Sequence, residues 1–463
     1  MIKLSCYLAF ITIIFNLIAC NKSADTTVIP PVIPPVITDT PMVQYRTPFS
    51  AVPDRRDAVI YQVNMRVFSP SESFQSITDR LDSIKSLGVN VIYLMPIYPV
   101  GILNAFNSPY CVKDYNAVNP EFGSLTDLRK LVDSAHAKKM AVILDWVANH
   151  TSWDNSWITN KSWYLQDANG NILSPPGMGW NDVAQLNFNN NDMRLAMIKA
   201  MKSWVYKTNI DGFRCDYAAG PPSDFWQQAI DTLRNISTHK LLLLAEGNNP
   251  SNFTVGFDFN FGFNFFYNLK SVYSANTSIL SINNLNTSEY TSATGTQQVV
   301  RYTSNHDVDG SDGTPLQLFG GRNGSLASFV IVACMKSVPM IYNGQEVGTP
   351  VRFTFPFVGQ TIDWSINPDI KAEYKRILAF RNSSVAIRQG SLTTYSTTDV
   401  CAFTKQQATD SVLIIDNLRN SVINYNLPAA LSNTTWIDAF SNQSVSLNTQ
   451  LILQPYTYLL LKK

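Results

Sequence analysis

Short, continuous apolar runs recur along the middle of the chain. Seven of them cover residues 58–65, 89–96, 140–147, 212–216, 241–246, 299–307 and 338–346, and a less regular eighth run lies around 256–266. Runs that are hydrophobic throughout are typical of parallel strands buried on both faces. Amphipathic helical patterns separate them, as at 124–138, where Ser124 and Asp127 predict a capping box. Eight strands with helical crossovers predict an α/β fold, a (β/α)8 TIM barrel.

The N-terminus has the pattern of an export signal. Lys3 precedes a mainly apolar run at residues 7–18, which is short for a membrane span and is typical of a secretory signal. The run ends in "LIAC", which resembles the lipobox of bacterial lipoproteins with Cys20 as the lipidated residue. We therefore expect an exported lipoprotein, periplasmic or at the cell surface, bound to the membrane through its N-terminal lipid. The alternative is an ordinary signal peptide with an incidental cysteine.

The composition changes along the chain predict four parts. A signal peptide covers residues 1–20, and a tether rich in Pro-Pro pairs, which favour extended polyproline conformation, covers 21–50. The barrel follows at 51–388 and includes an excursion at about 150–191. Short β runs such as 411–418 and 451–461 predict an antiparallel β-sandwich at 389–463.

Charge and cysteine content narrow the possible partners. The net charge is +1 and no long run of like charge occurs, so we expect a neutral ligand and no nucleic-acid partner. We also expect a monomer. Beyond the predicted signal and Cys20, the cysteines are scattered without metal-ligand spacing, and we interpret them as core thiols.

Polar residues cluster at the ends of the predicted strands. They are Asp145, His150, Arg214, Asp216, Glu246, His306 and Asp307. Barrels of this class build active sites at the C-terminal ends of their strands. Each residue alone could be a helix cap or an ion-pair partner, but that explanation is poor for all of them together.

Two of these carboxylates suit the cleavage of a glycosidic bond with retention. That reaction needs a carboxylate nucleophile and a carboxylic acid about 5 to 5.5 Å apart, and Asp216 and Glu246 can fill these roles. Arg214 alternates with Asp216 along one strand, so we expect its charge to keep Asp216 ionised. The apolar run before Glu246 predicts an environment that raises its pKa.

Four motifs carry a family resemblance. "LDWVANH" (144–150), "GFRCD" (212–216), "LLAEG" (243–247) and "YTSNHD" (302–307) resemble the signature regions of the α-amylase family of glycoside hydrolases, family 13. The resemblance extends from about Asp57 to the end of the chain. It implies that Asp216 is the nucleophile, Glu246 the general acid/base, and Asp307 a third carboxylate that binds sugar hydroxyls. It also implies a group of substrate-binding residues, which we take as Tyr110, His150, Arg214 and His306.

The chain departs from the family pattern in two places. Ala219 and Gly220 stand where a Lys-His pair is usual, so the subsite on the leaving-group side is expected to be built differently. The family's calcium site would use Asn149 and an Asp, but Gln185 stands at the Asp position. Because calcium prefers several charged oxygens, a bound Ca²⁺ stays open and no metal ligands are assigned.

The resemblance implies a retaining hydrolase that cleaves α-1,4 bonds in starch or maltodextrins. The alternatives are an α-1,6-acting or transglycosylating relative, or a catalytically silent glucan-binding protein of the same fold. The three carboxylates favour an enzyme, because a protein that only binds has no need of all three. The tryptophans of the excursion could line a glucan groove or form a small core; they are Trp153, Trp157, Trp163 and Trp180.

Overall fold

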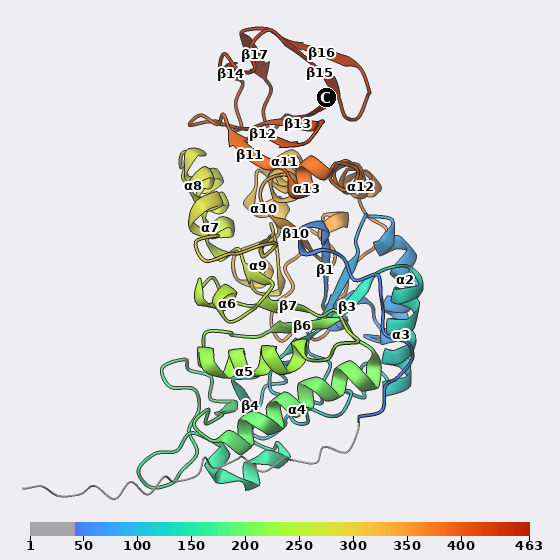
Figure 1. Ribbon diagram of the computed structural model, residues 1–463, viewed down its shortest axis with the longest axis vertical. Helices are drawn as coiled ribbons and strands as arrows, with labels where there is room; N and C mark the ends of the chain where they lie inside the picture. The colour runs from blue at the N-terminus through green and yellow to red at the C-terminus, as the bar shows by residue number, and fades with distance from the viewer. Residues whose placement is uncertain (1–41) are drawn as a thin grey trace, which may run out of the picture. The chain divides into compact units, whose positions relative to one another are not determined.

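The computed structural model describes residues 42–463, which form one compact unit (Figure 1). The predicted signal peptide, Cys20 and the tether up to residue 41 lie outside the described residues. Residues 42–50, the predicted end of the tether, belong to the compact unit, where Tyr45 donates a hydrogen bond to Asp133. Within 42–463, no helix combines the length and apolar character that crossing a membrane requires.

Eight parallel strands close into a barrel and confirm the predicted fold class. Around the barrel their order is β1, β10, β9, β8, β7, β6, β3, β2. The strands are β1 (Ile60–Val63), β2 (Val91–Leu94), β3 (Ala141–Trp146), β6 (Gly212–Cys215), β7 (Leu242–Ala245), β8 (Phe259–Phe261), β9 (Gln298–Arg301) and β10 (Val338–Tyr342).

The predicted extents of three strands were wrong. The run at 338–346 contains β10 only as far as Tyr342, and the 3-10 helix η4 (Gln345–Val347) follows. The run at 256–266 was predicted as strand, but β8 ends at Phe261 and helix α7 begins at Phe263. The run at 299–307 contains β9 only as far as Arg301, and helix α9 (His306–Ser311) begins at its end, where the Asn305 side chain accepts from the backbone N–H of Asp307 and of Val308. In each place a helix N-terminus follows the strand within a few residues, so one apolar run covers two elements.

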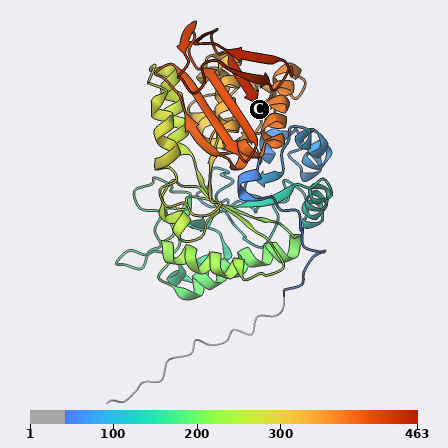
Figure 2. The same cartoon turned by 45° about the horizontal axis from the view of Figure 1, so that its top comes forward.

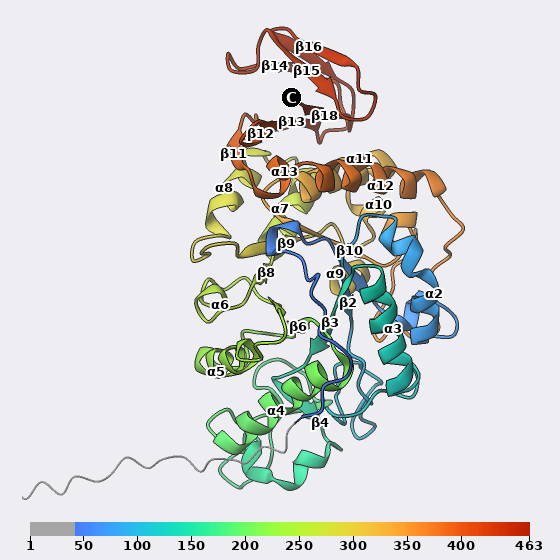
Figure 3. The same ribbon diagram turned by 45° about the vertical axis from the view of Figure 1, so that its right-hand side comes forward.

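Helices connect the barrel strands and lie outside them (Figures 1 and 3). The longer ones are α2 (Phe74–Lys85), α3 (Leu125–Ala137), α4 (Asn191–Thr208), α5 (Ser223–Arg234), α7 (Phe263–Ser274), α8 (Leu280–Ser288), α11 (Gly321–Cys334) and α12 (Pro368–Ser383). The predicted capping box is present, since Ser124 and Asp127 exchange side-chain to backbone hydrogen bonds at the start of α3. The crossover from β7 to β8 carries only the four-residue helix α6 (Ser251–Thr254).

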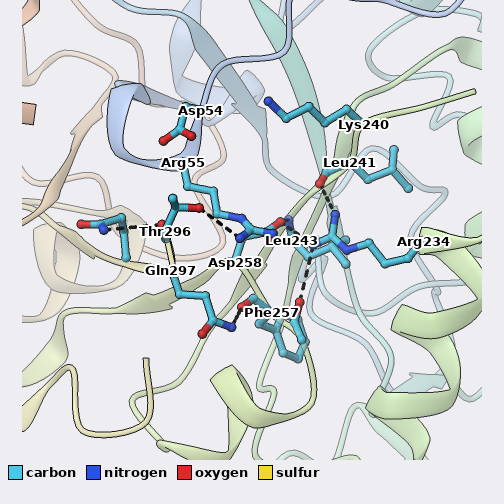
Figure 4. Close-up of polar contacts among 12 residues, drawn as sticks. Asp54, Arg55, Arg234, Lys240, Leu241, Leu243, Phe257, Asp258, Thr296 and Gln297 are labelled. Atoms are coloured by element: carbon cyan, nitrogen blue, oxygen red, sulfur yellow. Dashed lines mark hydrogen bonds and ion pairs between the residues drawn. The ribbon is translucent and has the colours of Figure 1, made fainter. Parts of the chain in front are cut away.

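The N-terminal end of the barrel is held by a buried carboxylate. Asp258, directly before β8, is fully buried and forms ion pairs with Arg55 at 2.5 Å and Arg234 at 2.7 Å. Its Oδ2 also accepts a hydrogen bond from the backbone N–H of Leu243 on β7 (Figure 4). This network joins the chain before β1 to β7, β8 and α5, and it leaves the opposite end of the barrel free for a site.

The excursion between β3 and α4 is small. It contains the antiparallel pair β4 (His150–Ser152) and β5 (Val183–Gln185) and two short 3-10 helices, η2 (Ser156–Thr159) and η3 (Lys161–Trp163). Figures 1 and 3 show it at the end of the compact unit opposite the C-terminal strands.

The C-terminal residues form antiparallel sheets beside α11 and the short helix α13 (Val385–Gln389) (Figure 2). A six-stranded sheet has the order β11, β12, β13, β18, β15, β16, and β14 pairs with β17. The apolar run at 451–461 is divided, because its halves lie in different sheets. The strands are β11 (Ser391–Thr394), β12 (Val400–Gln407), β13 (Asp410–Asn417), β14 (Ile423–Asn426), β15 (Thr434–Asp438), β16 (Ser444–Leu447), β17 (Gln450–Leu453) and β18 (Tyr458–Lys462).

Candidate active site

A cavity of about 650 Å³ opens at the C-terminal ends of the barrel strands. It brings together six of the residues predicted for the site, which are Tyr110, His150, Asp216, Glu246, His306 and Asp307. These residues come from four different strand ends and from the loop after β2, as the barrel topology requires.

Arg214 lies beneath the carboxylates and is fully buried on β6. Its Nη1 donates to Asp145 Oδ1 at 2.7 Å and to Asp216 Oδ1 at 2.9 Å, and its Nη2 lies 2.5 Å from Glu246 Oε1. The predicted contact with Asp216 is therefore present. However, one guanidinium is shared by three carboxylates from three strands, which the spacing within one strand could not indicate.

The cluster of Arg214 with Asp145, Asp216 and Glu246 has more acidic groups than positive charges, and this affects the pKa values of its carboxyl groups. Burial raises the pKa of Asp216, the nearby Glu246 adds to this effect, and Arg214 opposes it. Burial also raises the pKa of Asp145, again opposed by Arg214. The expectation that Arg214 would simply keep Asp216 ionised was therefore incomplete, because three acidic groups surround a single positive charge. This arrangement favours one retained proton in the cluster, and an acid-assisted reaction needs such a proton.

Glu246 is held at both carboxylate oxygens. Besides the ion pair with Arg214, Oε2 accepts a hydrogen bond of 2.7 Å from the backbone N–H of Tyr217. The predicted apolar surround is thus only part of its environment, because the strand β7 that precedes it is apolar but the cavity side is polar. The two contacts fix the direction in which the carboxyl group faces.

Two buried histidines face the same cavity as neutral rings. Burial lowers the pKa of His306, and likewise that of His150, to about 4. Gln62 Nε2 lies 2.8 Å from His306 Nδ1, and the Tyr110 hydroxyl lies 2.7 Å from His306 Nε2. Tyr110 also donates to Asp145 Oδ2 at 3.2 Å. The tyrosine ring is therefore fixed against the histidine and the carboxylate cluster.

Asp307 differs from the other carboxylates because its side chain is 53% exposed. It lies in the first turn of α9, with Oδ1 3.3 Å from His306 Nε2. An exposed carboxylate at the cavity wall is placed to accept hydrogen bonds from a polyhydroxylated ligand.

Sequence reasoning missed most of the aromatic lining of the cavity. The cavity is also lined by Phe106, Trp180, Tyr217, Phe263 and Phe355. Of the excursion tryptophans, Trp180 lines the cavity, whereas Trp157 and Trp163 pack on each other with ring centroids 5.2 Å apart. Phe106 and Phe355 lie in loops, Tyr217 directly follows the motif residue Asp216, and Phe263 is the first residue of α7. None of these places has a periodic sequence signal.

The positions matched to a calcium site do not suit a calcium ion. Asn149 Nδ2 donates to Gln185 Oε1 at 3.0 Å, and Gln185 Nε2 donates back to Asn149 Oδ1 at 3.2 Å. The two amides thus satisfy each other and offer no charged oxygen, which calcium prefers. Among residues 42–463, no three His, Cys, Asp or Glu side chains gather where they could hold a metal ion. The cysteines at 111, 215, 334 and 401 are free and buried, as predicted.

Comparison with known proteins finds similarity to the α-amylase family. Residues 69–171 match the family model described as "Alpha amylase, catalytic domain". The chain is 25% identical to alpha-amylase MalA of Haloarcula japonica over 327 residues, which is 67% of this chain but only 47% of that protein. It is also 25% identical to alpha-amylase 2 of Dictyoglomus thermophilum over 405 residues, 80% of this chain and 67% of that protein.

Solved structures share the fold. The maltogenic alpha-amylase AmyB from Thermotoga neapolitana superposes with a TM-score of 0.80 at 22% identity, covering 89% of this chain and 99% of that one. The alpha-amylase from Geobacillus thermoleovorans, solved in complex with acarbose, gives a TM-score of 0.75 at 22% identity, covering 89% of this chain and 99% of that one.

Proposed function

Because the chain carries a catalytic domain of the α-amylase family of glycoside hydrolases, we propose that it hydrolyses α-1,4-glucosidic bonds in starch or maltodextrins with retention. One observation carries the proposal. Asp216 and Glu246 contact the two terminal nitrogens of the same buried guanidinium and open into the same cavity. A nucleophile and an acid held side by side suit a double displacement.

In this mechanism Asp216 attacks the anomeric carbon while Glu246 gives its proton to the departing glycosidic oxygen. The bond to the leaving sugar breaks as the glycosyl–Asp216 ester forms. Glu246, now a carboxylate, takes a proton from water, and the resulting hydroxide displaces Asp216 from the anomeric carbon. Asp307, His306 and His150 bind the sugar hydroxyls.

Substitution of the nucleophile tests the chemical part of the proposal. Asp216→Asn keeps the shape of the side chain but removes the attacking charge, so turnover should be lost while glucan binding remains. Retention of more than about a hundredth of the wild-type rate would point to another nucleophile. Glu246→Gln should remain active only on activated aryl glycosides, whose leaving groups need little protonation; equal losses on starch and on such substrates would contradict the acid role.

Product analysis tests the bond specificity. We expect maltodextrins from amylose and no maltotriose from pullulan, since release of maltotriose from pullulan requires cleavage of α-1,6 bonds. Maltotriose as the product from pullulan would contradict the proposed α-1,4 specificity. Products longer than the substrate, formed from maltotriose, would assign the chain to transglycosylation instead.

We also propose that the chain is exported and anchored through a lipid on Cys20, on the strength of the "LIAC" motif. The native protein should then partition into detergent with the membrane fraction, because acyl chains provide the anchoring energy. Cys20→Ser should block maturation or release the protein. Recovery of the unmutated protein as a wholly soluble species that begins at another residue would refute the anchor and leave the hydrolase proposal untouched.

A further inference from the structure

We propose that Tyr217 and Trp180 form an apolar subsite for the sugar ring on the leaving-group side of the cleaved bond. The inference rests on the proposed function, because it assumes that Glu246 protonates the leaving sugar. It concerns how the chain binds that sugar at a place where the sequence offers only Ala219 and Gly220.

The backbone at Tyr217 has an unusual conformation that directs its N–H toward Glu246. Tyr217 directly follows Asp216 and has φ 40, in the left-handed region that non-glycine residues rarely adopt. In this conformation its N–H donates to Glu246 Oε2 at 2.7 Å. The tyrosine ring is therefore fixed beside the acid group by the same turn that positions that group.

The ring of Tyr217 belongs to a short aromatic row. Its centroid lies 5.1 Å from the Trp180 ring in an edge-to-face arrangement, and Trp180 lies 5.6 Å from His150. Both Tyr217 and Trp180 are partly exposed and line the cavity. Sugar rings present apolar C–H faces, and flat aromatic rings with a free surface can bury them.

Tyr217 also lines a further cavity. A second cavity of about 370 Å³ shares Tyr217 and Ala219 with the first and is lined further by residues such as Met178 and Phe188. Tyr110, His306 and Asp307 line only the first cavity. In the proposal, a glucan that extends past Glu246 toward Ala219 meets the ring of Tyr217, which lines both cavities. Because the acid lies next to the leaving oxygen, this is the leaving-group side.

The space occupied by Tyr217 depends on the glycine three residues later. A β-carbon at Gly220 would collide with Asn149 Oδ1 and would lie 2.7 Å from the Tyr217 ring. No side chain can therefore extend from position 220 without moving the ring or the Asn149–Gln185 amide pair. Ala219 adds no charge or hydrogen-bond donor. Because residues 219 and 220 provide no polar side chain, we expect the leaving sugar to bind through apolar contact with the rings of Tyr217 and Trp180.

Two substrates with different leaving groups test the inference. In maltotetraose the leaving group is a sugar, whereas in α-maltosyl fluoride it is fluoride, which leaves the proposed subsite empty. For Trp180→Ala and Tyr217→Ala, we expect kcat/KM on maltotetraose to fall about 10- to 100-fold, with a change of less than about threefold on α-maltosyl fluoride. Tyr217→Phe keeps the ring and should therefore recover most of the kcat/KM on maltotetraose that Tyr217→Ala loses.

The outcomes separate this inference from the proposed function. Wild-type protein inactive on both substrates would refute the proposed function. An active wild type with equal losses for Trp180→Ala on both substrates would refute the subsite alone. Trp180→Ala is less prone than Tyr217→Ala to displace Glu246, because no hydrogen bond or ion pair joins Trp180 to that residue among residues 42–463. A shift of the pH–rate profile in both alanine variants would indicate a change in the acid group and contradict a binding role.

Discussion

At the level of single residues, the protonation state of His306 follows clearly from the groups that surround its ring. His306 is 3% exposed, and the charged or titratable groups around its ring are Tyr110, Arg214, Asp145, Glu246 and Asp307. Burial, with Arg214 adding to it, lowers its pKa from 6.5 to about 4. The ring is therefore neutral at a pH well above 4.

This pKa shift predicts a pH-dependent contribution to stability. Between pH 6.5 and 4 the unfolded chain binds a proton at His306 that the folded protein does not bind, so the residue destabilises the fold as pH falls. Relative to His306→Gln, the wild type should lose about 1.4 kcal/mol of unfolding free energy per pH unit in this window. Urea unfolding of both proteins across this pH window measures the difference in their unfolding free energies. The contributions of the carboxylates, which both proteins contain, cancel in this difference. Parallel stability curves would contradict the shift.

The residue scale also shows where the sequence was informative. The alternation of Arg214 and Asp216 along one strand predicted their contact, because side chains two residues apart share a face. The contacts of Arg214 with Asp145 and Glu246 depend on neighbouring strands whose register no single segment specifies. Tyr217 could not be predicted either, since its role depends on a left-handed backbone conformation.

Among the elements, β6 is the strand that determines the position of the carboxylate cluster. It begins at Gly212, whose φ of +147 places it in a backbone region disfavoured for other residues, and it pairs with β3 and β7. A β-carbon at Gly212 would collide with the backbone carbonyl of Leu242 on β7. The glycine therefore allows the close approach of the two strands that carry Asp216 and Glu246.

Gly212→Ala should destabilise the protein strongly, by about 3 kcal/mol or more, because both the backbone conformation and the strand spacing oppose a side chain. Thermal unfolding of the purified variant measures this loss. Gly177→Ala is a suitable control, since it also has a positive φ but no atom within 4 Å of the added carbon. Equal, small losses in both variants would mean that the strand contact does not matter.

Beside the paired strands β4 and β5 of the excursion, the side-chain amides of Asn149, directly before β4, and Gln185, the last residue of β5, bond to each other. Since these amides satisfy each other, a chelator should leave the unfolding midpoint unchanged, whereas Gln185→Ala should lower it by removing the hydrogen bonds. Thermal unfolding with and without EDTA makes the comparison. A clear drop of the unfolding midpoint on chelation, reversed by added Ca²⁺, would contradict our conclusion that Asn149 and Gln185 do not suit a calcium ion.

At the scale of the whole compact unit, the C-terminal sheet shares its core with the barrel. One face of β12 and β13 packs into the barrel core, including Phe403 and Ile414, and the opposite face forms a second core with Ala402 and Leu413. Arg419 donates to the carbonyl oxygen of Val272 on α7 at 2.7 Å. The short β runs in the sequence predicted the C-terminal strands. The shared core could not be predicted, because it depends on which helices these strands pack against, and no local sequence pattern indicates that.

A shared core predicts a single cooperative unfolding transition for residues 42–463. Calorimetry should show one peak, and Arg419→Ala should lower the midpoint of that peak without splitting it, because barrel and sheet unfold together. A separate early transition of the C-terminal sheet would show that the two parts are independently stable.

The central claim is that Asp216 and Glu246 perform a double displacement, and the anomer released first tests it most directly. Two inversions at one carbon restore the original configuration, so proton NMR of fresh maltotetraose hydrolysis should show the α-anomer of the product before mutarotation. Initial release of the β-anomer would contradict a covalent intermediate on Asp216 and with it the assignment of the two carboxylates.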